Sequence, residues 1–220
     1  PTSGSVKIDG SNLGSALAGT IPANTISANT KGGFSIATFT GTGSNGTVAH
    51  GLNNAPAFVI VKKYSAAGNN WCIFHQGLAS ANTSRIFFTT AGRDSGGATT
   101  WNSTAPSSSV ISLGTNGNVN SSGADYLIYA WSEIEGMQKF SSYTGNGNND
   151  GPFVYTGFRP RMIFTKWFET GASAERWGVF DTARATYNPT SAHSYGQIQW
   201  DVTDGGSAGS NQILMINNST

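Results

Sequence analysis

An apolar run begins at residue 57 and reads AFVIVKKY through residue 64. Consecutive apolar residues of this kind are typical of a β-strand that is buried on both faces or nearly so. Similar short runs, rich in β-branched and aromatic residues and separated by Gly, Asn and Ser, lie at residues 34–39, 71–75, 85–90, 110–113 and 126–134. No window of a dozen residues carries an apolar stripe at helical spacing. The sequence therefore predicts an all-β fold.

The same run belongs to an internal repeat. FVIVK at 58–62 aligns with MIFTK at 162–166, WCIFH at 71–75 with WGVFD at 177–181, and FTGTGSN at 39–45 with YTGNGNN at 143–149. The matching elements recur in the same order, and the small differences in spacing fall in segments that read as turns. The repeat predicts two tandem β-sandwich units of jelly-roll type, at residues 34–136 and 137–220.

The second copy is shorter than the first. The strand predicted at residues 126–131 has no counterpart before residue 220. A sandwich without this strand exposes a sheet edge and part of its core. We therefore expect the chain to continue past residue 220, or another chain to supply the strand. The start at Pro1, without a leader-like segment, also indicates a piece of a longer protein.

Residues 1–33 differ from the rest because they contain no aromatic side chain. Their aliphatic side chains are isolated among Gly, Ser, Thr and Asn, a spacing from which one chain builds no core. The segment is predicted to be an extended stalk or linker. In a stalk, several chains share the isolated aliphatics, so we expect a homotrimer with the stalk along its three-fold axis.

Charge and composition exclude several partners. Twelve Lys and Arg against 11 Asp and Glu leave a net charge of +1, which gives no electrostatic reason to expect nucleic acid or an anionic membrane. No apolar run is long enough to span a bilayer, so membrane insertion is not expected. Cys72 is the single cysteine, which excludes an internal disulfide and a cysteine-based zinc site.

Two motifs with possible chemistry have simpler interpretations. GTGSNG at 41–46 satisfies the G-x-G-x-x-G pattern, but the residues after it are β-like, so a hairpin turn is favoured over a dinucleotide-binding loop. His50, His75 and His193 show no zinc-ligand spacing and are interpreted as surface or core residues.

The acidic residues are scattered. Glu133 and Glu135 alternate on a predicted strand and could act as the paired carboxylates of a glycosidase, but the solvent face of an edge strand is the favoured interpretation. DVTDGG at 201–206 offers oxygen ligands for calcium, yet it lacks the alternating acids of a dedicated loop. We predict no catalytic residue, no cofactor and no metal site.

The tryptophans fall into two groups. Trp71 and Trp177 occupy equivalent positions in the repeat beside apolar residues, so they are predicted to be core anchors. Trp101 lies in the polar stretch TTWNST at 99–104, and Tyr187 lies in a loop-like stretch. Exposed aromatic rings flanked by Asn and Ser are suited to stacking on sugars, although they also plug the ends of sandwiches. Trp101 and Tyr187 are the candidate glycan-contact residues.

Several stretches resemble a domain of virion structural proteins from tailed phages, especially marine and cyanobacterial phages. The matching residues are 33–43, 50–52, 55–56, 101–106, 133–136, 142–147 and 150–160, so the likeness covers about residues 33–190. The resemblance implies a place in the virion and supplies no catalytic residues. Members usually continue with another strand beyond the point where this sequence stops.

These observations predict a phage fibre or capsid-attached appendage that acts by binding and display rather than by catalysis. Its expected partners are other virion proteins, further copies of itself, and polysaccharide on the host surface. Two alternatives stay open: a capsid decoration protein that braces the shell, and a fibre-borne polysaccharide depolymerase. Two carboxylates converging in a groove would favour the depolymerase, and a flat apolar face would favour decoration.

Overall fold

The computed structural model describes residues 6–13, 17, 19–89, 92–148, 151–169, 177–183 and 197–199, the last three as backbone only. The chain forms two compact units. The first holds Pro1–Phe87, Arg93–Ile134 and Lys139–Ser142, and the second holds Phe88–Gly92, Glu135–Gln138 and Tyr143–Thr220. Among the described residues the regular elements are mainly strands, and the helices are short, so the prediction of an all-β fold is confirmed.

The strands of the first unit are β1 (Val6–Ile8), β2 (Ser11–Asn12), β3 (Ala23–Asn29), β4 (Phe34–Thr40), β5 (Gly46–Ala49), β6 (Phe58–Lys63), β7 (Cys72–His75), β8 (Ile86–Phe87), β9 (Val110–Leu113) and β10 (Asp125–Trp131). Its helical segments are the 3-10 turn η1 (Ala81–Thr83) and the helices α1 (Gly97–Trp101) and α2 (Gly117–Asn120). β4, β6, β7, β9 and β10 agree to within a few residues with runs that the sequence predicts, and β8 is much shorter than its run.

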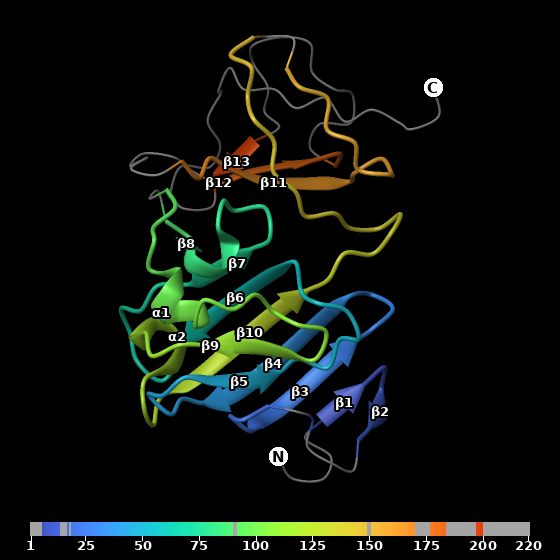
Figure 1. The fold of residues 1–220 in the computed structure, drawn as a ribbon. Coiled ribbons are helices and arrows are strands. Elements are labelled where there is room, and N and C mark those ends of the chain that lie inside the picture. The colour runs from blue at the N-terminus through green and yellow to red at the C-terminus, as the bar shows by residue number, and fades with distance from the viewer. Residues whose placement is uncertain are drawn as a thin grey trace. The chain divides into compact units, whose positions relative to one another are not determined.

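Eight strands of the first unit form one sheet in the order β2-β1-β3-β4-β10-β6-β7-β8 (Figure 1). β10 lies between β4 and β6 and pairs antiparallel with both, although it follows them far along the chain. The only parallel pairing in this sheet joins β1 to β3. Because β10 has a neighbour on each side, its backbone groups are satisfied along its whole length.

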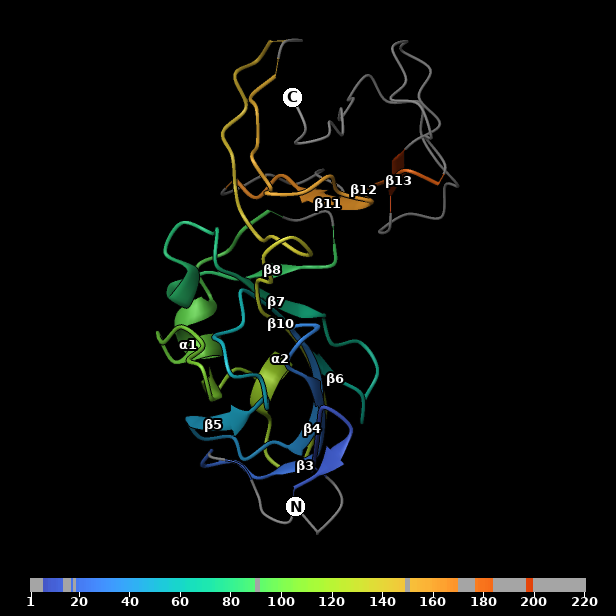
Figure 2. The ribbon, with the colours of Figure 1, turned by 90° about the vertical axis from the view of Figure 1, so that its right-hand side faces the viewer.

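A second layer covers one face of this sheet. β5 pairs with β9, and this pair lies with α1 and α2 on the same side of the large sheet (Figure 2). The core fills the space between the layers; its largest fully buried side chains include Phe39, Trp101, Ile111, Leu113, Tyr126 and Ile128. Alternate residues of β4 and β10 point into this core, as the period of a strand requires.

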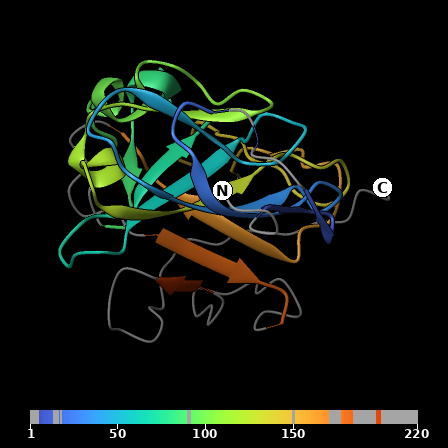
Figure 3. The same cartoon turned by 90° about the horizontal axis from the view of Figure 1, so that it is seen from below.

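The N-terminal segment is part of the first unit, which corrects the prediction of a stalk at residues 1–33. β1, β2 and β3 extend the large sheet beyond β4 (Figures 1 and 3). Val6, Ile21 and Ile26 are each at most 3% exposed and belong to the same core as the later strands. The isolated aliphatics need no second chain, because long-range pairing with β4 places them on one buried face.

The described strands of the second unit are β11 (Met162–Lys166), β12 (Trp177–Asp181) and β13 (Gln197–Gln199), which form one sheet in that order. In this sheet Ile163 pairs with Phe180. The residues at the equivalent repeat positions, Val59 and Phe74, pair in the same way between β6 and β7. The two hairpins therefore share one register.

The repeat does not extend to every element. Residues 138–144, the counterpart of β4, form no named strand. In the first unit β4 is bonded to β3 and β10, and neither neighbour has a counterpart among the described strands of the second unit. A strand without a neighbour leaves its backbone groups to water, which removes the reason for extended pairing here.

The two repeated tryptophans differ in burial. Trp177 is 4% exposed, as predicted for a core anchor. Trp71 is 40% exposed, which corrects the same prediction for the first copy. Trp71 precedes β7 and lies against Tyr129 on the face of the sheet that is opposite the core, with the ring centroids 6.5 Å apart.

The glycine-rich stretch at 41–46 is a loop and not the start of a helix, but it is no hairpin turn either. It links β4 in the large sheet to β5 in the small one. The buried side chain of Asn120 holds this loop: it accepts from the Thr42 N–H at 2.8 Å and donates to the carbonyls of Ser44 at 2.7 Å and Gly114 at 2.9 Å. Gly43 supplies a positive φ of 74°.

Candidate functional site

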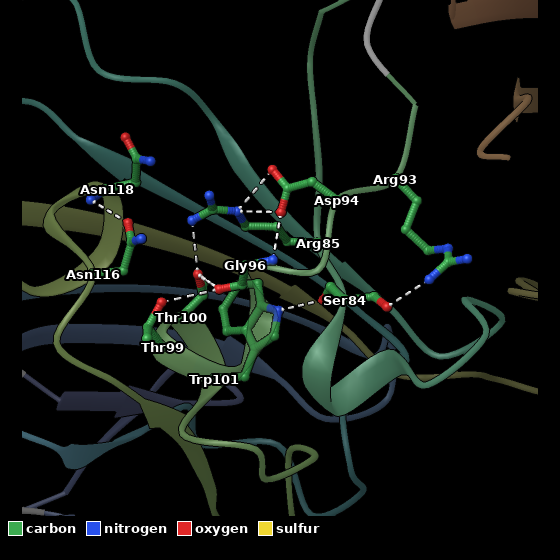
Figure 4. Close-up of polar contacts among 10 residues, drawn as sticks. All are labelled: Ser84, Arg85, Arg93, Asp94, Gly96, Thr99, Thr100, Trp101, Asn116 and Asn118. Carbon is green, nitrogen blue, oxygen red and sulfur yellow. Dashed lines mark hydrogen bonds and ion pairs between the residues drawn. The ribbon is translucent and has the colours of Figure 1, made fainter. Parts of the chain in front are cut away.

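Trp101 is buried, so it is not the glycan contact that the sequence predicts. It ends α1 and is 1% exposed. Its Nε1–H donates to the Ser84 carbonyl at 2.9 Å (Figure 4). Its ring also meets Phe74 edge-on at a centroid distance of 5.9 Å. The polar residues beside Trp101 in the sequence suggest an exposed ring, but α1 turns the indole toward the core. Tyr187, the other candidate, lies outside the described residues.

A polar cluster surrounds the buried indole (Figure 4). The Arg85 Nε donates to the Asp94 carboxylate at 2.8 Å, and its Nη1 donates to Thr100 Oγ1 at 3.0 Å. Asp94 Oδ1 also accepts from the Gly96 N–H at 2.7 Å. The cluster ties the start of α1 to the segment before β8. Every one of these contacts joins neighbouring backbone segments, so the arrangement is a structural clamp for α1.

A different group of aromatic side chains gathers on the outer face of the large sheet. We call it the aromatic face, and its five members are Phe34, Phe58, Trp71, Tyr129 and Trp131. The alternation of β4 and β10 turns Phe34, Tyr129 and Trp131 away from the core and leaves them half-buried. No helix or second sheet of the described first unit lies on this side (Figure 2).

Strand register fixes the order of these side chains. Phe34 pairs with Trp131, and Trp131 pairs in turn with Phe58. Tyr129 lies one row along, and the planes of its neighbours Phe34 and Trp71 are tilted from its own by only 10° and 12°, with centroids 6.4 and 6.5 Å away. Three nearly parallel rings from different segments therefore cross the sheet in sequence.

One end of the aromatic face is bounded by the segment after β10. Phe140 stacks on Phe58 at a centroid distance of 5.7 Å. The Glu133 carboxylate accepts from the Phe140 N–H, from Gln76 Nε2 and from Lys139 Nζ, at 2.9–3.0 Å. These contacts hold residues 139–142 beside the sheet.

Paired residues of neighbouring strands form three rows across this face, through Trp131, Tyr129 and Leu127 of β10. Polar and cationic groups continue these rows toward the N-terminal strands. Asn29 pairs with Phe34, Ser27 with Ile36, and Thr25 with Thr38. Lys7 follows Ser27 on β1. On the other side, the Lys62 ammonium lies 5.8 Å from the centroid of Trp71 and donates to the Asn69 carbonyl. The three rows contain two lysines and no carboxylate.

Burial shifts the pKa values of two titratable groups in the core, His50 and Cys72, so that their uncharged forms are favoured. Burial lowers the pKa of His50 to about 4, so its ring is neutral at physiological pH. Burial raises the pKa of the Cys72 thiol to about 12, which leaves little nucleophilic thiolate. Burial alone would raise the pKa of Glu133, but the hydrogen bonds from Lys139, Phe140 and Gln76 outweigh it and lower the pKa.

Glu133 and Glu135 are not alternating residues of one strand, which is the arrangement that both sequence interpretations assumed. β10 ends at Trp131, so neither residue lies on a strand. The general acid of such a pair requires a raised pKa, and that of Glu133 is lowered. In the described part of the chain, no three His, Cys, Asp or Glu side chains come together as a metal site. The described helices include none of the length and apolarity that crossing a membrane demands.

The sequence contains a signal for the aromatic face that the prediction did not use. In residues 34–40 and 125–131, apolar or aromatic residues occur at both odd and even positions, which indicates apolar groups on both faces of each strand. The aromatic residues Phe34, Tyr129 and Trp131 fall on the parity opposite the core. Their gathering depends on β10 lying beside β4, and this pairing is a tertiary fact.

Comparison with known proteins identifies a family for this chain but does not identify a function. Neither the curated proteins nor the solved structures yield a significant match to this chain. One family model matches residues 9–219, which is nearly the whole chain and includes both units. The protein therefore belongs to the DUF7483 family, a domain of unknown function.

Proposed function

We propose that this protein is a virion surface protein of a tailed phage, a fibre or capsid-attached appendage that acts by binding and display. The phage assignment is supported by the resemblance of residues 33–190 to phage virion domains. The observation that carries the binding role is the aromatic face, a set of partly exposed rings on a rigid sheet. Contiguous exposed aromatic surface on a folded domain marks a site of interaction.

The proposal includes two tandem sandwich units that descend from one ancestor. The shared register of the β6–β7 and β11–β12 hairpins supports it, because independent hairpins have no reason to pair equivalent residues. We expect the second unit to have the same two-layered architecture as the first.

A capsid decoration protein is the second candidate, and the aromatic face favours it as well. Partly exposed rings such as Tyr129 and Trp131 are also common in protein–protein interfaces. In that role the protein would brace neighbouring capsid subunits. The depolymerase is the least supported alternative, because its candidate carboxylates Glu133 and Glu135 do not alternate on a strand: β10 ends at Trp131.

Labelling of purified virus particles tests the proposal. Antibodies raised against the recombinant chain should mark particles that carry its gene, and mass spectrometry of those particles should contain its peptides. Gold particles confined to the tail or to projecting fibres support the appendage. An even distribution over the capsid shell supports decoration instead. Absence of the chain from purified particles overturns both.

A further inference from the structure

The outer side of the large sheet carries three kinds of group: the rings of the aromatic face, uncharged polar side chains and cations. Its rings lie on β4, β6, β10 and the segment before β7. Uncharged hydroxyl and amide groups, from Thr25, Ser27 and Asn29, continue the rows on β3. Cations stand at both ends, with Lys7 on β1 and Lys62 beside Trp71. The rows span four strand spacings from β1 to β6, which is about 19 Å (Figure 1).

The charges on this surface select among possible occupants. Carboxylates border the rows, and each accepts hydrogen bonds within the chain: Asp9 from Thr30, Asp125 from Thr40, and Glu133 from Lys139, Gln76 and Phe140. Within the rows the charged groups are Lys7 and Lys62, so an anionic group that lies along the rows can pair with these two lysines. Two cations are too few for the many phosphate contacts from which nucleic-acid binding gains its affinity.

The chemistry of the rows fits sugar rings better than another apolar surface. A pyranose ring presents apolar C–H groups on its faces, which pack on aromatic rings, and hydroxyl groups at its edge. Hydroxyl and amide side chains such as Thr25, Ser27 and Asn29 can exchange hydrogen bonds with those sugar hydroxyls. An apolar partner surface would bury the Ser27 hydroxyl and the Asn29 amide N–H groups without offering them hydrogen bonds, at a cost for each group left unpaired.

We propose that the aromatic face binds an extended acidic polysaccharide, whose rings pack on Phe34, Tyr129 and Trp71 and whose carboxylates pair with Lys62 and Lys7. The Lys62 ammonium has three N–H donors and gives one to Asn69, so it can also meet a carboxylate. This inference rests on the proposed function as a surface-binding protein and names the ligand class and the site.

Direct binding of the purified chain tests the site. The probes are three uronate polymers of different linkage, namely polygalacturonate, alginate and hyaluronate, together with the methyl ester of polygalacturonate. The ester keeps the sugar rings and removes their charge. We expect at least one uronate polymer to bind, more weakly at high salt, and the ester to bind about tenfold more weakly than its acid form.

Three variants locate the binding. Trp71→Ala removes the most exposed ring of the face and should weaken binding about tenfold, while Trp71→Phe should restore most of it. Lys62→Gln should weaken binding of the acidic polymer and leave that of the ester unchanged. Tyr155→Ala is the matched control, since Tyr155 is 69% exposed in the second unit and should leave binding unchanged. Near-ultraviolet circular dichroism checks the fold of each variant.

Several results overturn the inference. They are the failure of all three uronate polymers to bind the wild type, equal binding by folded Trp71→Ala and Lys62→Gln, or equal losses in Tyr155→Ala. A dimer that Trp71→Ala dissociates would assign the face to a second copy instead, and tighter binding of single-stranded DNA would assign it to nucleic acid. If labelling places the chain on the virion and no polymer binds, this inference fails and the proposed function stands.

Discussion

At the scale of single residues, the described core contains polar side chains whose partners are specific. His50 and Asn120 are both fully buried. His50 Nδ1 accepts from the Leu52 N–H and its Nε2 donates to the Ser107 carbonyl, each at 3.1 Å, which identifies the neutral tautomer with its proton on Nε2. Such groups stabilise one arrangement of the chain because every alternative leaves them unsatisfied.

Acidification should destabilise the protein through His50. Burial lowers its pKa from 6.5 to about 4, so between these values the unfolded chain binds a proton that the folded chain does not. The free energy of unfolding is therefore full above pH 6.5 and falls as the pH drops to about 4, by roughly 3 kcal/mol. Urea unfolding at several pH values measures this. His50→Gln should flatten the profile in this range, and an unchanged slope would contradict the assignment.

Asn120 should be required for the loop that joins the two sheets. Asn120→Ala leaves the Thr42 N–H and the Ser44 and Gly114 carbonyls without this partner, and we expect a loss of about 2–4 kcal/mol in the free energy of unfolding. Asn24→Ala is the matched control, because Asn24 is exposed and its side chain donates a hydrogen bond to Thr40 at 3.2 Å. Chemical denaturation of both variants makes the comparison. Equal losses would show that the buried hydrogen bonds of Asn120 contribute no more to the free energy of unfolding than the exposed one of Asn24.

At the scale of elements, the position of α1 follows from close backbone packing. A Cβ at Gly97 would lie 2.2 Å from the Ser84 backbone nitrogen, and one at Gly114 would lie 1.9 Å from the Thr99 carbonyl oxygen. Neither glycine has a positive φ. These residues are needed for close approach, and together with the Arg85 clamp they hold Trp101 in the core.

Widening this contact should cost stability. Gly97→Ala forces α1 away from Ser84, and we expect the free energy of unfolding to fall by about 3 kcal/mol or more. Gly145→Ala provides the control, since nothing lies within 4 Å of a Cβ there. The measurement is the midpoint of thermal unfolding, with tryptophan fluorescence as a second probe because Trp101 should become exposed to solvent. Similar midpoints for the two variants would refute tight packing of α1.

At the scale of the whole molecule, the expectation of a homotrimer loses its original argument. Val6, Ile21 and Ile26 are buried within one chain, so they do not call for partners. The trimer now rests on the likeness to phage fibres. It would raise the avidity of a weak glycan site where three faces reach one polymer.

Light scattering of the soluble chain measures the assembly. A trimer has three times the 22.9 kDa mass of the chain, and we expect that value at micromolar concentration. The Trp71→Ala variant should keep the same mass if its ring serves ligand binding rather than association. A monomer under these conditions would contradict the trimer and leave the aromatic face to act singly.

The sequence by itself determined the all-β class, the positions of β4, β6, β7, β9 and β10, and the equivalence of the two hairpins. These features follow from side-chain alternation and β-propensity, which act between residues close in the chain. The sequence also offers burial in the core as one of two interpretations of His50, and the structure places it there.

Only the tertiary structure decided which strands are neighbours. The sequence treats residues 1–33 as unable to build a core, yet β3 pairs with β4 and buries Ile26 beside residues from much later in the chain. The same long-range pairing turns Trp101 inward and gathers Phe34, Tyr129 and Trp71 on one face. Burial of a side chain depends on what lies across from it, and strand pairing is set by the balance of the whole core rather than by local pattern.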